Sequence, residues 1–339
     1  MTDHTSPVPL AESEPWALYA GDARSVLASM PDQSANCIVT SPPYWGKRDY
    51  GVPGQYGHED TPAAYVDTMR DVFREARRVL ADDGTCWLNL GDSYSTSGGG
   101  GASGKHAYLG AHAATHAAAG VHAKNLLGLP WRVALALQED GWILRNAVIW
   151  HKPNAMPESV RDRLSCRYEL LFLLVKSPGY WFDLDPIREP HKTVKPSGSS
   201  AATCHGRTRP PGHAGSRTRP PKYGPGTAEV TTARHHRARS HTSGHPNGRN
   251  PGDVWSILTR PYKGPHFAAY PIDLPLRCIA AGCKPGGTVL DPFAGSGTTG
   301  LAAIQLGRRF TGIDLSPDFV RLAAGRLAQV IADRQEGTR

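Results

Sequence analysis

The chain has 339 residues, of which 39% are hydrophobic and 20% are charged, and its formal charge is +8 at pH 7. This length and composition predict a globular protein of one large domain or two, and they exclude a chain that is disordered throughout. Because no run of about 18 apolar residues occurs and the N-terminus lacks the features of a signal peptide, we expect a cytoplasmic protein without a membrane span.

The N-terminal part of the chain alternates apolar runs with amphipathic segments, which is typical of an α/β fold with parallel strands. We expect strands at residues 16–20, 36–40 and 85–90, and helices at about 22–30 and 62–80. Residues 96–123, which follow, are rich in Gly, Ala and His, and we predict a flexible loop there. The histidines of this loop lack carboxylate or cysteine partners at ligand spacing, so no metal site is expected.

Regular structure resumes with a predicted helix near 126–139 and predicted strands at 142–150 and 169–177. Residues 190–252 are then rich in Pro, Gly, His and Arg and show no apolar periodicity. Between residues 191 and 250 there are eleven Lys and Arg against one acid, so the rest of the chain is close to neutral. A basic segment on a near-neutral body indicates a polyanionic partner.

The C-terminal part has the most regular pattern. Its predicted helices lie at 274–283, 297–307 and 317–334, and its predicted strands at 287–291 and 309–315.

The residues TSPPY, at positions 40–44, directly follow the apolar run 36–40. A Pro-Pro pair cannot donate backbone hydrogen bonds and keeps its neighbours extended, so the strand must end there. The motif therefore predicts a stiff platform whose backbone carbonyls are available as acceptors.

A second motif, VLDPFAGSGTTG, places Gly295, Gly297 and Gly300 between a predicted strand and a predicted helix. This G-x-G-x-x-G spacing also serves nicotinamide and flavin cofactors, but the next strand ends in Asp314, where an acid can accept the hydroxyls of a ribose. Only 39 residues follow Gly300, so the N-terminal half must supply the missing strands of the sheet. Both motifs should then lie in one cleft, at the carboxyl ends of neighbouring parallel strands.

Together the motifs resemble those of the S-adenosylmethionine-dependent DNA amino-methyltransferases of the beta arrangement, in which the catalytic motif precedes the cofactor motif. The matching stretches are YAGD (19–22), TSPPY (40–44), HFAAYP (266–271), DPFAGSGT (291–298) and GIDLS (312–316). The resemblance implies a Rossmann-like methyltransferase fold with a doubly wound, mostly parallel sheet, circularly permuted and carrying an inserted target-recognition region. Its expected parts are a catalytic half at 15–184, a basic recognition region at 185–265 and a cofactor half at 266–335.

By the same resemblance, a methyl group is transferred from S-adenosylmethionine to the exocyclic amino group of a base flipped out of double-stranded DNA. The implied catalytic residues are Ser41, Pro42, Pro43 and Tyr44. The Ser41 hydroxyl and the Pro42 carbonyl would accept hydrogen bonds from the amino group, and Tyr44 would stack on the base.

The target base is indicated by the first residue of the platform. In this family Asp or Asn there usually accompanies adenine N6, and Ser accompanies cytosine N4, so Ser41 favours cytosine, with adenine as the alternative. Methylation at cytosine C5 is not expected, because none of the six cysteines follows a proline as its nucleophile would.

The resemblance also implies binding residues. Asp22 would approach the adenine amino group of the cofactor, Asp314 its ribose, and the backbone from Phe293 to Gly297 its methionine part. The predicted cofactor-binding residues are Asp22, His266, Phe267, Pro271, Asp291, Pro292, Phe293, Gly295, Ser296, Gly297, Thr298 and Asp314. The predicted DNA contacts are Lys47, Arg48, Lys152, Arg161, Arg163 and Arg167.

The same residues bear on further partners and on other functions. A cognate restriction endonuclease is a candidate partner, and both a monomer and a dimer fit the sequence. A nicotinamide-dependent oxidoreductase is disfavoured, because it has no use for TSPPY. A non-catalytic DNA-binding module does not explain two ligand motifs in one cleft, whereas an RNA amino-methyltransferase remains open.

Overall fold

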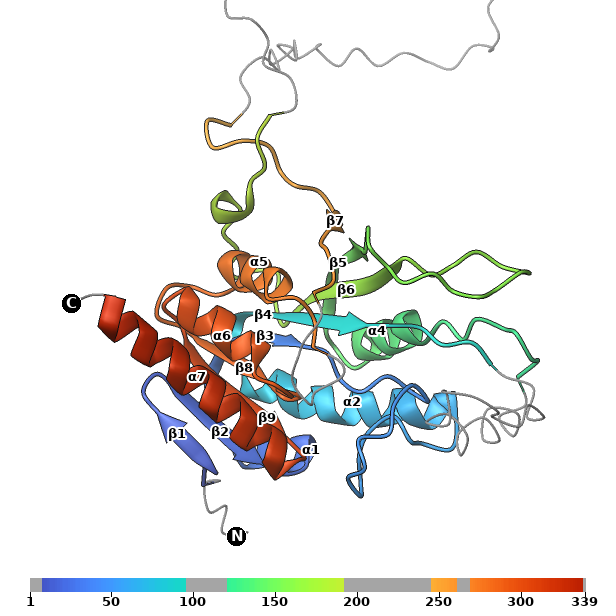
Figure 1. Ribbon diagram of the computed structural model, residues 1–339, viewed down its shortest axis with the longest axis horizontal. Helices are drawn as coiled ribbons and strands as arrows, with labels where there is room; N and C mark the ends of the chain where they lie inside the picture. The colour runs from blue at the N-terminus through green and yellow to red at the C-terminus, as the bar shows by residue number, and fades with distance from the viewer. Residues whose placement is uncertain (1–7, 96–120, 192–244, 261–268, 338–339) are drawn as a thin grey trace, which may run out of the picture. The chain divides into compact units, whose positions relative to one another are not determined.

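A single mixed sheet organises the protein, whose computed structural model describes residues 8–95, 121–191, 245–260 and 269–337 (Figure 1). The nine strands of this sheet are β1 (Ala11–Ser13), β2 (Trp16–Ala20), β3 (Ala35–Thr40), β4 (Leu80–Leu90), β5 (Ile143–His151), β6 (Tyr168–Val175), β7 (Val254–Ser256), β8 (Thr288–Asp291) and β9 (Arg309–Asp314). The helices are α1 (Ala23–Ser29), α2 (Pro62–Val79), α4 (Leu129–Glu139), α5 (Asp273–Gly282), α6 (Thr298–Gln305) and α7 (Pro317–Gly337), with a 3-10 turn, η2, at Asp185–Ile187.

The strand order is β1-β2-β9-β8-β3-β4-β6-β5-β7. Strands β2, β9, β8, β3 and β4 are mutually parallel, and the expectation of a doubly wound, mostly parallel sheet is confirmed. Strand β3 lies between β4 and β8, with Ile38 paired to Cys86 on one side and to Leu290 on the other. The N-terminal half therefore supplies the strands that complete the sheet beside the glycine motif.

Helices cover both faces of the sheet because successive strand residues point to opposite sides (Figure 1). On β3, Ile38 packs into the core cluster that includes residues of α1, α2 and α4, whereas Cys37 and Val39 pack into the cluster that includes α5, α6 and α7. Helix α2 illustrates the pattern: the Thr61 side chain caps its first turn by accepting from the Ala64 amide, and its buried residues recur every three or four positions.

Three strands differ from a simple reading of the sequence. Strand β6 runs antiparallel to both β4 and β5, and the three-residue strands β1 and β7, which extend the two edges, were not predicted. Strands of three residues are too short to show an alternating pattern. The reversed direction of β6 has a consequence for the site, because it brings the start of β6 beside the end of β4, with Leu170 paired to Leu90.

The chain divides into two compact units, Met1–Arg188 with Asn250–Arg339, and Glu189–Arg249. The second unit is described only near its two ends, where Glu189 and Arg249 form a β-bridge and an ion pair. The predicted recognition region, 185–265, extends beyond this unit on both sides, since η2 and β7 belong to the first unit. Most of the basic segment, and residues 96–120 of the predicted loop, lie outside the described residues.

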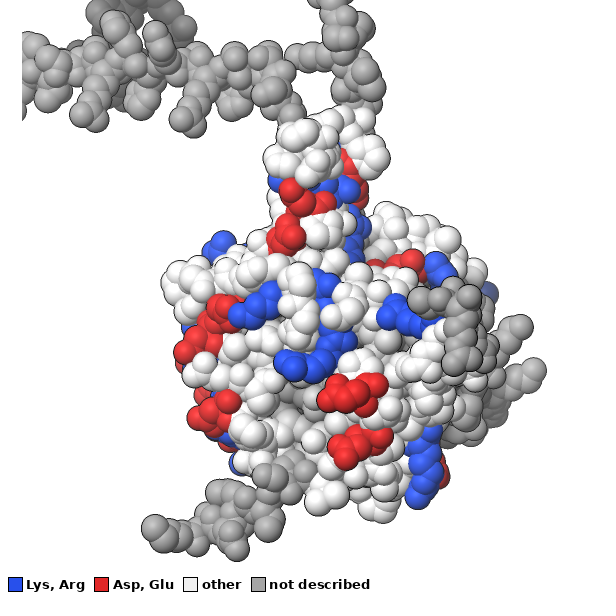
Figure 2. All heavy atoms as spheres, turned by 90° about the vertical axis from the view of Figure 1, so that its left-hand side faces the viewer, with Lys and Arg blue, Asp and Glu red and all other residues white. Residues whose placement is uncertain are grey.

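Charged side chains of both signs are mixed on one face of the first unit. On the face that Figure 2 presents, Lys and Arg are interspersed with Asp and Glu. This agrees with the near neutrality of the chain outside residues 191–250. Within the described ranges, no helix is long and apolar enough to cross a membrane.

Candidate active site

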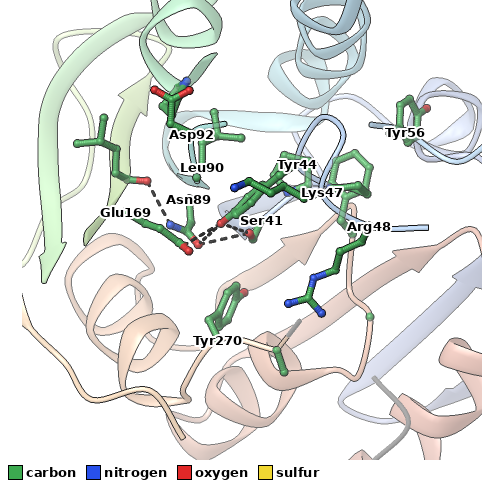
Figure 3. Close-up of a pocket in the computed structure, with 18 of the residues that line it drawn as sticks. Ser41, Tyr44, Lys47, Arg48, Tyr56, Asn89, Leu90, Asp92, Glu169 and Tyr270 are labelled. Carbon is green, nitrogen blue, oxygen red and sulfur yellow. Dashed lines mark hydrogen bonds between the residues drawn. The ribbon is translucent and has the colours of Figure 1, made fainter. Parts of the chain in front are cut away.

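A cavity of about 1170 Å³ opens at the carboxyl ends of the parallel strands (Figure 3). Ser41 and Tyr44 of the platform line it, together with Asp291, Phe293 and Gly295 of the glycine motif. The prediction that the two motifs share one cleft is confirmed, because β3 and β8 are neighbours and end at the same edge.

One hydrogen bond ties the two motifs directly. The Thr40 hydroxyl donates to Asp291 Oδ1 at 2.6 Å, across 251 positions in the chain. Beyond Thr40, helix α2 also holds the platform, since the Tyr65 hydroxyl donates to the Pro43 carbonyl at 3.0 Å. Trp45, which follows the platform, is buried and donates from its ring nitrogen to the Glu59 carbonyl at 2.7 Å. The platform is therefore rigidly attached to the core.

Tyr44 lies against the backbone at the end of β4. A Cβ added to Gly91 would come within 2.5 Å of Tyr44 Cε2, so the ring occupies space that only glycine leaves free. The Tyr44 hydroxyl lies 2.9 Å from Glu169 Oε2 and 3.1 Å from Asn89 Oδ1. Burial and the neighbouring Glu169 raise the pKa of Tyr44 well above its usual value, so the phenol keeps its proton.

Three residues around the platform were not found from the sequence: Asn89, Gly91 and Glu169. Asn89, in β4, is buried, and its Oδ1 lies 3.3 Å from the Ser41 hydroxyl. Glu169, in β6, forms an ion pair with Lys152. All three lie in or directly after strands that reach the platform only through the pairing of β3, β4 and β6. The LNLGD run, at 88–92, ends a predicted strand beside the platform and was the available signal for the first two.

The glycine loop makes the turn into α6. Gly297 has a φ of +76°, a conformation that glycine adopts without strain, and its added Cβ would meet Ala323 Cβ at 2.9 Å. Gly300 allows α6 to pack closely on β9, since its Cβ would meet Phe310 at 2.6 Å. The Gly295 amide donates to Asp314 Oδ2 at 2.8 Å, and the Ser316 amide donates to Asp314 Oδ1 at 2.9 Å. Burial raises the pKa of the Asp314 carboxyl.

Asp291 is buried, with 2% of its surface exposed, and accepts hydrogen bonds from Thr40, Thr299 and the Phe293 amide. Burial raises its pKa to about 6, and these hydrogen bonds only partly offset the effect. A buried carboxylate at the bottom of a cleft is suited to a ligand that carries positive charge.

Asp22 is held by contacts within the protein, and its approach to the adenine of the cofactor stays a prediction. Its Oδ1 caps α1 by accepting from the Ser25 amide at 2.8 Å, and its Oδ2 accepts from the Tyr56 hydroxyl. Burial opposes ionisation, but the hydrogen bonds from Tyr56 and Ser25 outweigh it, so the pKa of Asp22 lies below its usual value. Tyr56 lines the cavity and contacts Phe293 edge to face, with ring centroids 5.4 Å apart.

The remaining predicted cofactor residues are placed by the structure where they are described. Pro271, Pro292, Ser296 and Thr298 line the cavity, whereas His266 and Phe267 lie outside the described residues. The groups that line the cavity suit S-adenosylmethionine. Carboxylates can accept from its ribose hydroxyls and attract its cationic groups, the glycine backbone lets a ligand approach closely, and aromatic rings lie in the same cavity. No group of three or more potential metal ligands occurs among the residues described.

The predicted DNA contacts fall into two groups. Lys47, Arg48, Arg161 and Arg167 are exposed, and the first two line the cavity. Arg163 pairs with Glu158 and lies over the Tyr94 ring at 4.1 Å. Only 18% of the Lys152 side chain is exposed, because its ammonium group pairs with Glu169 inside the cleft and lies 4.3 Å from the centre of the Trp150 ring. Its contact with DNA stays a prediction.

Comparisons with known proteins agree with this geometry. A family model described as DNA methylase matches residues 35–325. The Type II methyltransferase M.Cfr9I of Citrobacter freundii is 41% identical, covering 91% of this chain and 87% of its own, and M.SmaI of Serratia marcescens is 39% identical, covering 91% and 90%.

Two solved structures share the fold. The cytosine-N4-specific PvuII DNA methyltransferase superposes with a TM-score of 0.61 at 18% identity, covering 94% of this chain and 89% of that one. A putative DNA modification methylase of Thermus thermophilus, in complex with S-adenosyl-L-methionine, superposes with a TM-score of 0.52 at 25% identity, covering 92% and 94%.

Proposed function

Because the chain belongs to the DNA methylase family of N6- and N4-directed enzymes, we propose that it methylates the N4 amino group of cytosine in duplex DNA. The family establishes a DNA methyltransferase that uses S-adenosylmethionine. The observation that carries the finer proposal is Ser41, which stands at the first position of the platform and lines the cavity. In this family serine at that position usually accompanies cytosine.

The platform residues have separate roles in this proposal. An amino nitrogen conjugated to its ring is a poor nucleophile, so the site must draw its lone pair out of conjugation. The Ser41 hydroxyl and the Pro42 carbonyl accept hydrogen bonds from the two amino hydrogens, and Pro43 stiffens the backbone between them and Tyr44. Tyr44 stacks on the flipped base, which contributes on the order of 1–3 kcal/mol.

S-adenosylmethionine supplies the methyl group as a substituent of a positively charged sulfur. Asp314 binds the ribose hydroxyls, the backbone from Phe293 to Gly297 holds the methionine part, and the Asp291 carboxylate favours the cationic end. Asp22 contributes to binding the adenine of the cofactor by positioning Tyr56, because its carboxylate already accepts a hydrogen bond from the Tyr56 hydroxyl. Holding the amino nitrogen against the methyl group provides much of the rate through proximity.

DNA is held by the exposed cations at the mouth of the cavity, Lys47 and Arg48, and by Arg161 and Arg167 on the loop between β5 and β6. Residues 185–265 recognise the target sequence, which the excess of cations between 191 and 250 supports. A restriction endonuclease of the same specificity is the expected companion, since Type II methyltransferases are among the relatives.

The proposal is tested by incubating the purified protein with tritiated S-adenosylmethionine and mixed-sequence duplex DNA, followed by digestion to nucleosides and mass analysis. We expect the label on N4-methylcytosine. Label on N6-methyladenine would overturn the base assignment and keep the family. Label in a parallel incubation with RNA, without label in DNA, would overturn the choice of substrate.

A further inference from the structure

We propose that Glu169, held by Lys152, sets the direction of the hydrogen bonds around Ser41, so that the Ser41 oxygen faces the base as an acceptor. The inference rests on the proposed function, because it concerns the amino group that the site methylates. Glu169 acts through Tyr44 rather than on the substrate, and it is therefore a positioning residue.

The direction of these hydrogen bonds is fixed first at Asn89. Its Nδ2 donates to the Leu170 carbonyl at 3.2 Å, which fixes the side-chain amide so that Oδ1 faces the platform. That oxygen lies 3.3 Å from Ser41 Oγ and 3.1 Å from the Tyr44 hydroxyl (Figure 3). Because a carbonyl oxygen can only accept, any hydrogen bond between it and either hydroxyl is donated by the hydroxyl.

The Tyr44 hydroxyl has one hydrogen and two acceptors within reach. Glu169 Oε2 is the nearer acceptor, at 2.9 Å. It is a carboxylate oxygen, and a carboxylate accepts stronger hydrogen bonds than the side-chain amide of Asn89. If Tyr44 donated to Asn89 instead, its lone pairs would face the Glu169 oxygen at that same distance. Tyr44 therefore donates to Glu169, and its own oxygen is left to accept.

Ser41 is the last hydroxyl in this series of hydrogen bonds. Its hydroxyl lies 3.2 Å from the Tyr44 oxygen and 3.3 Å from Asn89 Oδ1, and both now act as acceptors. Whichever of them takes the Ser41 hydrogen, that hydrogen points into the cluster. The lone pairs of Ser41 are then presented to the cavity, as an amino group requires.

The ion pair with Lys152 supports this arrangement. Both side chains are 18% exposed, and the Lys152 ammonium group is also held over the Trp150 ring, at 4.3 Å. The ion pair holds the Glu169 carboxylate in place, and a carboxylate has no hydrogen to donate to Tyr44. A neutral or amide side chain in its place could donate to Tyr44 and reverse the chain of hydrogen bonds.

The test is a double-mutant cycle between Glu169→Gln and Tyr44→Phe. Glutamine has the same shape but can donate its amide hydrogens to Tyr44, which turns the Tyr44 hydrogen away from it, towards Asn89 and Ser41. We expect Glu169→Gln to lower kcat on duplex DNA by about tenfold or more, with the Kd for S-adenosylmethionine unchanged. Phenylalanine keeps the ring but removes the hydroxyl that transmits the effect, so in that background Glu169→Gln should cost less than about twofold.

An equal fold loss in both backgrounds would overturn the inference, because Glu169 would then act without the Tyr44 hydroxyl. Full activity of Glu169→Gln would overturn it as well. If Glu169→Gln fails to bind S-adenosylmethionine, Glu169→Asp is taken through the same cycle, since it keeps the acid but withdraws it from Tyr44. Absence of any DNA methylation by the unaltered protein would count against the proposed function instead.

Discussion

Replacing Gly91 by alanine should lower methyl transfer by displacing Tyr44. The added Cβ would lie 2.5 Å from Tyr44 Cε2 and 2.9 Å from Cδ2, whereas ordinary contacts lie between 3.4 and 4 Å. The ring must therefore move by about 1 Å, and a displacement of that size at a reacting centre can cost about 100-fold in rate. Because Gly91 does not have a positive φ, the substitution introduces no backbone strain of its own.

The measurement is kcat for tritium transfer to duplex DNA, together with the Kd for S-adenosylmethionine by calorimetry. We expect kcat to fall by about 100-fold while the Kd stays within a factor of about two. Gly179→Ala is the matched control, since its added Cβ meets nothing within 4 Å. Gly91→Ala should also have little further effect in a Tyr44→Ala background, where the clash is absent. Full turnover of Gly91→Ala would refute the role given to the position of the Tyr44 ring.

Three further predictions concern the cofactor loop and the basic segment. The raised pKa of Asp291, about 6, means that the unfolded state ionises first, so this residue lowers stability as the pH rises from its unfolded pKa towards 6. Between about pH 5 and pH 7 the unfolding free energy of the unaltered protein should fall by about 1 kcal/mol relative to Asp291→Asn, measured by urea denaturation, and parallel curves would contradict the assigned pKa. Gly297→Ala should weaken S-adenosylmethionine binding by about tenfold or more, because the added Cβ would sit on a residue with a φ of +76° and lie 2.9 Å from Ala323 Cβ. An unchanged affinity in calorimetry would exclude a role for this turn. Deleting residues 196–248 should weaken DNA binding and flatten its dependence on salt, since fewer counterions are released, whereas an unchanged slope in a fluorescence titration would mark the segment as a passive linker.

The sequence was sufficient to predict most of the sheet and the meeting of its two motifs. The alternation of apolar runs located the parallel strands, and the shortage of chain after Gly300 required β8 to pair with a strand from the N-terminal half. These predictions succeeded because they depend on local periodicity and on chain length, and both can be read directly from the sequence.

The partners of the platform could not be predicted in the same way. Glu169 and Lys152 flank a loop, and only the antiparallel pairing of β6 with β4 and β5 places Glu169 beside Tyr44. The sequence shows Lys152 as one cation among several near Arg161, and nothing local distinguishes a lysine in an internal ion pair from one that binds phosphate. The motif predicts that Asp22 contacts the cofactor, but it does not show that the carboxylate caps α1 and accepts from Tyr56.

The hydrogen bond between Thr40 and Asp291 also has a consequence for how the protein is made. Its two residues are 251 positions apart, and at about 5–20 residues per second the ribosome needs on the order of 10 to 50 s to pass from one to the other. During that interval the edge of β3 that will pair with β8 has no partner, and an unpaired edge is a template for association with other chains. A nascent chain thus carries the platform long before the ribosome reaches the glycine motif that shares its cleft.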